Sequence, residues 1–206
     1  MPDTRRPRVG ILISGRGSNM VALVRSMHEG RVPAVPAIVI ANVPTAPGLK
    51  TAAEMGVETA ILDHTTIRPR EDHERAMIDL LSEHAVDIVC LAGYMRRLSP
   101  LFVGAFSGRI LNVHPGLLPA FPGLDAQKAA LEHGVKVAGC TVHFVDDELD
   151  HGPIVLQATV PVNDDDTVAT LSARILEQEH AIYPQALALL AAGKLEIDGR
   201  RVRIRR

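Results

Sequence analysis

The chain has 206 residues, of which 47% are hydrophobic and only 3% aromatic, and its formal net charge is -2 at pH 7. This balance excludes a general electrostatic attraction to nucleic acid, and no apolar run reaches the length of a membrane span. We therefore expect neither a nucleic-acid nor a membrane partner. The length predicts a single domain, residues 1–206, and the Ala, Val, Leu and Ile content is typical of a parallel sheet covered by helices.

The cysteines and the start of the chain bear on the compartment. Cys90 and Cys140 each lie in an apolar run without a Cys-x-x-Cys partner. They indicate neither a disulfide framework nor a zinc site. The first residues lead into no signal-peptide core. We expect a cytoplasmic protein that is a monomer or a homodimer.

Over the first two thirds of the chain, short apolar runs alternate with amphipathic segments. The expected strands are residues 8–13, 35–41, 57–61, 86–91 and 109–113, with helices between them. Two longer strands follow, residues 137–145 and 153–160. This pattern predicts an α/β fold with one open, mostly parallel, twisted sheet and helices on both faces.

The last part of the chain predicts a long helix and a hairpin. Residues 167–192 are periodic, and three carboxylates at residues 164–166 precede them as an expected cap rather than a metal site. Pro184 is expected to kink or interrupt this helix near Tyr183. Asp198-Gly199-Arg200 predicts a hairpin turn. The arginine-rich run 200–206 then predicts a solvated edge strand rather than an RNA contact.

The first expected strand ends in a glycine-containing loop, Ser14-Gly15-Arg16-Gly17-Ser18-Asn19, and leads directly into a helix. Glycines allow close backbone approach, and the N–H groups at a helix start favour an anion. The third glycine of a dinucleotide fingerprint and the lysine of a nucleoside-triphosphate loop are both missing. The loop therefore predicts a monophosphate site, although a tight turn without a ligand needs the same glycines.

Two further loops are expected at the same edge of the sheet, because ligands of open α/β sheets collect at the carboxyl ends of strands. One is Gly93-Tyr94-Met95-Arg96-Arg97-Leu98 and the other is Asn112-Val113-His114-Pro115. Asn112 and His114 are two residues apart on a strand, so their side chains project to the same side.

An amide, an imidazole and a carboxylate together suit acyl transfer through a tetrahedral oxyanion. Asn112 can donate to the oxyanion, His114 can carry a proton, and Asp150 in the acidic loop can orient the imidazole. Spacing alone does not place Asp150 beside His114, and a structural histidine at a strand end is the competing interpretation. His143 belongs to a strand pattern, and the loop lacks the spacing of a calcium site, so we expect no metal.

These motifs resemble the phosphoribosylglycinamide formyltransferases of purine biosynthesis. The resemblance covers nearly the whole chain and is carried by residues 14–19, 91–96, 112–115, 149–153 and 178–184. It implies two small-molecule substrates, glycinamide ribonucleotide and the co-substrate 10-formyltetrahydrofolate. Tyr94, where the family often has Phe, and His151 are mild departures.

The resemblance also implies residue roles. Catalysis is expected from His114 as proton donor, Asn112 as oxyanion donor and Asp150 as the group that favours the imidazolium. The ribonucleotide is expected to bind at Gly17, Ser18, Asn19, Pro115 and Glu179. The folate is expected to bind at Arg70, Met95, Arg96, Arg97, Leu98, Val145, Asp146 and Asp147.

Alternatives from two classes remain. One is the same folate chemistry on methionyl-tRNA, on an amino sugar or on water, although those enzymes carry a further domain for which this chain has no room. The other is a non-catalytic folate or nucleotide binding module. Tight binding without turnover would favour the second.

Overall fold

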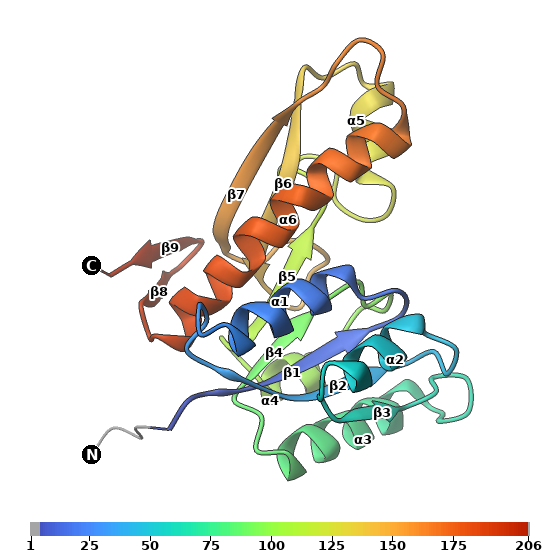
Figure 1. The fold of residues 1–206 in the computed structure, drawn as a ribbon, viewed down its shortest axis with the longest axis vertical. Helices are drawn as coiled ribbons and strands as arrows, with labels where there is room; N and C mark the ends of the chain where they lie inside the picture. The colour runs from blue at the N-terminus through green and yellow to red at the C-terminus, as the bar shows by residue number, and fades with distance from the viewer. Residues whose placement is uncertain (1–4, 206) are drawn as a thin grey trace.

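Five parallel strands form the first part of the sheet in a computed structural model that describes residues 5–205. They are β1 (Arg8–Ile13), β2 (Val35–Ala41), β3 (Thr59–Ile61), β4 (Ile88–Leu91) and β5 (Ile110–His114). Their order is β3-β2-β1-β4-β5. The predicted parallel sheet is confirmed (Figure 1).

β5 begins one residue later than the sequence predicts, and β3 and β4 each begin two residues later. The N–H of Val57 bonds to the Ala52 carbonyl at 3.0 Å, and the N–H of Val86 bonds to the Leu81 carbonyl at 2.9 Å. Both groups therefore close the end of the preceding helix instead of joining the sheet. The predictions over 57–61 and 86–91 were wrong at their first residues for this reason.

Four further strands extend the sheet, so that its order continues β5-β6-β7-β9-β8. They are β6 (Val137–Phe144), β7 (Ile154–Pro161), β8 (Leu195–Asp198) and β9 (Arg201–Ile204). β6 is antiparallel to both β5 and β7, and β8 and β9 form the predicted hairpin. The arginine-rich strand β9 lies between β7 and β8, so its prediction as the edge strand was wrong and β8 is the edge. Residues 1–4 and Arg206 lie outside the described residues.

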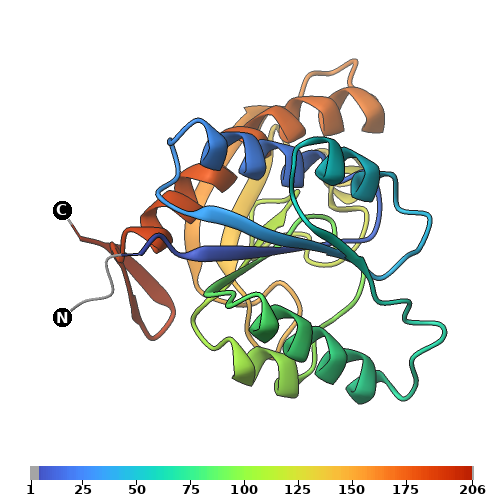
Figure 2. The ribbon, with the colours of Figure 1, turned by 60° about the horizontal axis from the view of Figure 1, so that its bottom comes forward.

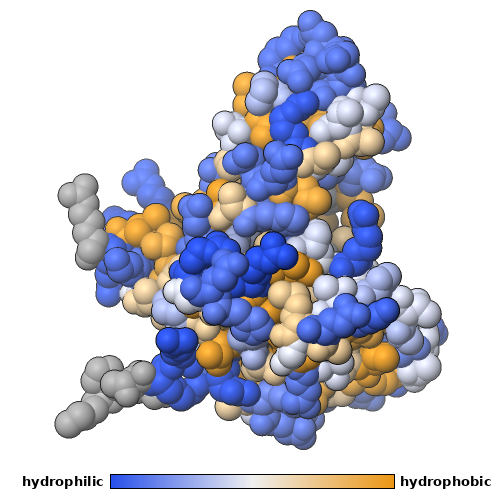
Figure 3. Space-filling view, viewed as in Figure 1, coloured by the Kyte–Doolittle hydropathy of each residue, from blue (hydrophilic) through white to orange (hydrophobic). Residues whose placement is uncertain are grey.

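Helices cover both faces of the sheet (Figure 2). They are α1 (Ser18–His28), α2 (Pro47–Glu54), α3 (Arg70–Glu83), α4 (Pro100–Ala105), α5 (Ala126–Glu132) and α6 (Val168–Ala191). α1, α2 and α6 lie on one face and α3 and α4 on the other, and a separate apolar core fills each side. Figure 3 shows a mostly hydrophilic surface over α1 and α6 with smaller hydrophobic patches. Within residues 5–205, no helix has both the length and the apolarity to cross a membrane.

The long C-terminal helix differs from its prediction in two ways. Its N-cap is Thr167, whose hydroxyl accepts from the Thr170 N–H, so the three aspartates are not the cap. Asp166 instead pairs with Arg174 at 2.9 Å, and this pairing holds the pKa of its carboxyl well below the ordinary value. Pro184 lies inside an uninterrupted helix. The Tyr183 hydroxyl lies 3.0 and 2.9 Å from two sheet carbonyl oxygens, which fastens that turn to the sheet.

Candidate active site

The loop after β1, residues 14–19, brings backbone groups close to α2 and to a small cavity. Gly17 has φ 70 and precedes α1, whose N-terminus has no side-chain cap. The Gly48 N–H donates to the Gly15 carbonyl at 3.1 Å, and a Cβ on Gly48 would lie 2.9 Å from that oxygen. Residues 14–19 line a cavity of about 240 Å³ together with Ala92, Gly93 and Met95. Uncapped N–H groups at a helix start beside a small cavity suit an anion.

A buried pair joins this loop to the long helix. Asn19 Nδ2 donates to Glu179 Oε2 at 2.7 Å, and both residues are buried. Burial raises the pKa of the Glu179 carboxyl, against the smaller opposing effect of the Asn19 hydrogen bond. Asn19 Oδ1 is also buried and has no hydrogen-bond partner among the described residues. Glu179 does not line this cavity, and its carboxylate lies next to Asn19, which does.

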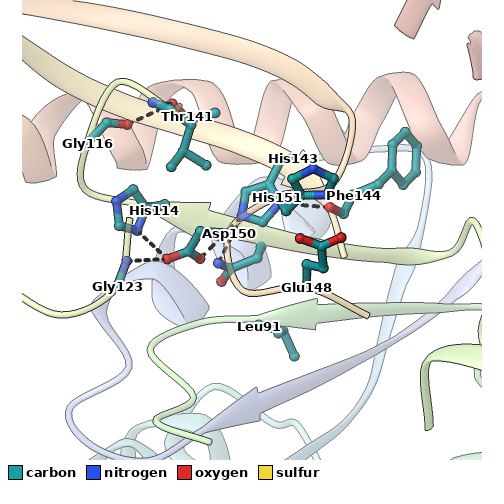
Figure 4. A network of polar contacts seen from close by, with 12 residues as sticks. Leu91, His114, Gly116, Gly123, Thr141, His143, Phe144, Glu148, Asp150 and His151 are labelled. Atoms are coloured by element: carbon teal, nitrogen blue, oxygen red, sulfur yellow. Dashed lines mark hydrogen bonds and ion pairs between the residues drawn. The ribbon is translucent and has the colours of Figure 1, made fainter. Parts of the chain in front are cut away.

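The predicted amide, imidazole and carboxylate come together at the end of β5. His114 Nδ1 lies 3.2 Å from Asp150 Oδ2, and both side chains are buried. The Gly123 N–H donates to the same carboxylate oxygen at 2.8 Å (Figure 4). His114 Nε2 lies 2.8 Å from the Phe121 carbonyl oxygen. Both ring nitrogens thus face acceptors, an environment that suits an imidazole carrying two N–H groups.

A second histidine lies between the amide and the carboxylate. His143 on β6 is paired with Asn112 in the sheet register, and its Nε2 lies 3.2 Å from Asn112 Nδ2 and 3.8 Å from Asp150 Oδ1. Its Nδ1 lies 2.7 Å from the Phe144 carbonyl, so Nδ1 is the donor and Nε2 accepts from the amide. Burial lowers the pKa of His143, which keeps the ring neutral and able to accept.

The loop that carries Asp150 has an unusual backbone. Asp150 has φ 51, in the left-handed region that few residues other than glycine adopt. A Cβ on Gly152 would lie 1.8 Å from the Phe144 carbonyl oxygen, so only glycine fits there. These two positions turn the chain back toward β5. The acidic loop therefore places its carboxylate by backbone geometry.

A cavity of about 590 Å³ lies over this group of residues. The predicted residues that line it are Met95, Arg96, Arg97, Leu98, Asn112, His114, Pro115, Val145, Asp146 and Asp150. The large cavity and the smaller one share Gly93 and Met95, so the two form neighbouring parts of one groove. Met95, Leu124 and Leu149 are exposed apolar side chains in its lining.

Two predicted folate-binding residues do not line the cavity. Arg70 begins α3, bonds to Glu74 at 3.1 Å and donates to the Arg97 carbonyl. Asp147 accepts from Arg97 through its carbonyl oxygen. Both residues therefore contact Arg97, which does line the cavity. The sequence did not assign Gly123, Leu124, Asp125, Gln127 or His143, which also line it. Strand alternation from Thr141 to His143, opposite Asn112 and His114, is the signal that could have found His143.

Other chemistries find less support in this structure. Burial raises the pKa of the Cys90 and Cys140 thiols to about 12, so neither is a ready nucleophile at neutral pH. Within residues 5–205, no group of three His, Cys, Asp or Glu side chains could hold a metal ion. The polar groups at the groove suit proton transfer and oxyanion stabilisation.

Residues 7–187 match the formyl transferase family, and the chain belongs to this family. The expected resemblance is thereby confirmed. Among solved structures, glycinamide ribonucleotide transformylase 1 from Symbiobacterium toebii is 51% identical, with a TM-score of 0.97 over 99% of this chain and 96% of that one. Phosphoribosylglycinamide formyltransferase of Escherichia coli (strain K12) is 42% identical over 93% of this chain and 94% of its own length.

The chain is also similar to part of a longer protein. It is 46% identical, over 95% of its length, to the human trifunctional purine biosynthetic protein adenosine-3. The chain spans 19% of that relative's length, about one fifth. A formyltetrahydrofolate deformylase from Pseudomonas syringae shares the fold at 23% identity with a TM-score of 0.89.

Proposed function

We propose that this chain, as one domain, transfers a formyl group from 10-formyltetrahydrofolate to the amine of glycinamide ribonucleotide in purine biosynthesis. The observation that carries the proposal is the groove, in which a backbone anion site and an Asn112, His114 and Asp150 cluster are neighbours. The names of the S. toebii and E. coli relatives support the same reaction.

The two ends of the groove suit the two substrates. The phosphate of the ribonucleotide binds the N–H groups of Gly17 and Ser18 at the start of α1. Asn19 and Glu179 bind the ribose hydroxyls, which would give the buried Asn19 Oδ1 a donor. The pterin occupies the larger cavity along Met95–Leu98, Pro115 and residues 145–150. Arg70 and Arg97 face the charged tail of the folate.

The reaction needs one oxyanion donor and one proton carrier. The ribonucleotide amine attacks the formyl carbon, and the carbonyl oxygen becomes an oxyanion that accepts from Asn112 Nδ2 and from protonated His114. The new C–N bond forms, the carbonyl re-forms, and the bond to the folate nitrogen breaks as that nitrogen takes a proton from His114. The amine's extra proton then passes to the neutral His114, which restores the imidazolium.

The contacts of His114 suggest which proton moves. Its Nδ1–H faces the Asp150 carboxylate, and its Nε2–H faces the neutral Phe121 carbonyl. If a substrate atom takes the place of the Phe121 carbonyl at Nε2, the ion pair between His114 and Asp150 stays intact. If it takes the place of the Asp150 carboxylate at Nδ1, that ion pair is broken. Nε2–H is therefore the proton that is donated, and Asp150 stabilises the imidazolium that exists before this donation and keeps its bond to Nδ1–H afterwards.

The orientation of Asn112 follows from His143. One Nδ2–H of the amide is held by the lone pair of His143 Nε2, so the amide nitrogen cannot exchange places with its oxygen without losing this bond. The second Nδ2–H remains for the oxyanion. His143 thus preorganises the donor that the reaction uses.

The direct test measures folate product by absorbance with purified protein and 10-formyltetrahydrofolate, with and without glycinamide ribonucleotide. The proposal expects product only when the ribonucleotide is present. Product without an acceptor would contradict it and indicate the hydrolase. Tight binding of both ligands without product would indicate a binding module.

Two broader expectations belong to the proposal. The protein is placed in the cytoplasm, where its free thiols Cys90 and Cys140 would stay reduced. It acts as a monomer or a homodimer on small molecules.

A further inference from the structure

The loop between β6 and β7 needs support from outside the groove. Asp150 holds a left-handed backbone, which a residue other than glycine keeps only when surrounding contacts fix it. On the inner side, the Gly123 N–H and His114 hold its carboxylate. Arg97 also donates to the Asp147 carbonyl, but Arg97 itself lines the cavity.

The outer side of this loop is held by an arginine from the C-terminal hairpin. Arg200 Nη2 donates to the carbonyl of His151, the residue after Asp150, at 2.6 Å. Arg200 Nη1 lies 2.8 Å from His151 Nε2, and His151 Nδ1 lies 2.9 Å from Asp146 Oδ2. One tautomer serves both ring contacts, with Nδ1–H donating to the carboxylate and Nε2 accepting from the guanidinium. These contacts connect the two ends of the loop.

The hairpin meets the main sheet at the same point. β9 pairs with β7 through Ile154 and Arg201, directly beside these contacts. Arg203 pairs with Asp198 and Arg205 with Glu196, so these arginines bond within the hairpin. Arg200 instead reaches across to the loop. Among the described arginines of residues 200–205, Arg200 is the one whose side chain bonds to the loop that carries Asp150.

We propose that Arg200 is a positioning residue that holds loop 146–152, and with it Asp150, in place for the reaction. This inference rests on the proposed function for its kinetic consequences but not for the contact itself. The guanidinium fork makes two bonds in fixed directions, which a lysine ammonium at the same position does not reproduce.

Hydrogen–deuterium exchange tests the contact without any assumption about activity. In Arg200→Ala and Arg200→Lys, the peptide covering residues 145–153 is expected to exchange faster than in the wild type. Arg203→Ala is the matched control, because it removes the same charge from the same hairpin but leaves the loop contacts. Equal exchange of this peptide in Arg200→Ala and Arg203→Ala would overturn the inference.

Kinetics separate positioning from a loss of stability. Arg200→Ala is expected to lower kcat/KM for 10-formyltetrahydrofolate about threefold to tenfold, the size expected for the loss of one ordinary hydrogen bond. The KM for the ribonucleotide should stay unchanged in Arg200→Ala. A general loss of folded protein changes neither KM, whereas a loss of positioning raises the KM for the folate. Unchanged folate kinetics in Arg200→Ala would contradict the positioning role. Absence of ribonucleotide-dependent turnover in the wild type would instead contradict the proposed function, and the exchange result would still decide the contact.

Discussion

The two ends of the groove are built from different parts of the chain. The proposed phosphate end is made by residues 14–19, where Gly17 has φ 70 and the uncapped start of α1 borders a small cavity. The proposed catalytic end is made by side chains from β5, β6 and the loop after β6. Backbone donors suit the holding of a group that does not react, and paired side chains suit the transfer of a proton. Substitutions at the two ends should therefore change different kinetic constants.

The largest effect is expected at the catalytic end. Asn112→Ala removes the oxyanion donor and His114→Ala removes the proton donor, so each should lower kcat about a hundredfold or more. The KM for the ribonucleotide should change little, because the phosphate loop is untouched. Steady-state kinetics with both substrates measure this difference. Near-wild-type kcat in either variant would contradict the roles of these residues.

The next effect is expected at His143, through Asn112. An asparagine at position 143 can replace the Nδ1–H donor of His143, but its side chain is too short to reach the Asn112 amide. A glutamine can place its oxygen where His143 Nε2 lies and so accept from Asn112. We expect His143→Asn to lower kcat about tenfold or more and His143→Gln to lower it less, because an oriented donor is lost in the first. His73→Gln is the control, since His73 is equally buried and bonds to Leu62 on another part of the molecule.

A double-mutant cycle decides whether His143 acts through the amide. In an Asn112→Ala background, His143→Asn should cost almost nothing further, because the donor that it orients is already gone. Additive losses would show an independent role.

The pH dependence of stability gives a second readout of His143. Because burial lowers the folded-state pKa of His143, the unfolded chain binds more protons below about pH 6.5. His143 therefore contributes a loss of stability as pH falls through that value, and His143→Gln should remove this contribution.

A smaller effect is expected at the phosphate end. Gly17→Ala places a Cβ on a residue with φ 70, only 3.2 Å from Met20 Cε, and should displace the loop N–H groups. We expect the KM for the ribonucleotide to rise about tenfold while kcat stays near the wild type, because the left-handed conformation costs an alanine on the order of 1 kcal/mol. Gly30→Ala imposes the same strain, at φ 74 with open space around it, at the far end of α1. Equal KM values in the two variants would contradict the phosphate site.

The smallest effect is expected at Glu179, where a substitution should increase the stability of the protein and weaken binding of the ribonucleotide. Burial raises the folded-state pKa of Glu179, so the charged carboxylate costs stability as pH rises from about 4.5 through that pKa. Glu179→Gln should therefore raise the melting temperature at neutral pH by a few degrees, a shift of about 1 kcal/mol or less. It should also raise the KM for the ribonucleotide about threefold through a lost ribose contact. Glu177→Gln, on the exposed side of the same helix, should change neither.

The sequence predicts the features of the fold and the site that neighbouring residues determine, and it does not predict those that depend on residues far apart in the chain. Period-two alternation correctly placed Asn112 and His114 on one side of a strand, and the glycines correctly marked the loop before α1. Both are local signals. The approach of Asp150 to His114 depends on the antiparallel pairing of β5 with β6 and on the φ of 51 at Asp150, neither of which leaves a local signal.

The wrong or missing predictions also concern features that depend on contacts between distant parts of the chain. Pro184 was expected to kink or interrupt the helix, but α6 is not interrupted, and the contacts of the Tyr183 hydroxyl hold this turn against the sheet. The hairpin was predicted correctly, but its strand order was not, because β9 joins β7 through a single tertiary pairing. His143 was assigned to a strand, which is correct, while its contact with Asn112 follows only from the register of two strands.

The most direct test of the proposed mechanism is the variant Asp150→Asn. Its kcat is measured with both substrates saturating, and the binding of each ligand is measured by calorimetry. Asparagine tolerates the left-handed backbone and keeps the side-chain shape while it removes the charge that pairs with His114. We expect unchanged binding of the ribonucleotide and a kcat lower by about a hundredfold or more. A kcat close to the wild type would contradict the claim that this carboxylate, held at the catalytic end of the groove, supports proton transfer by His114.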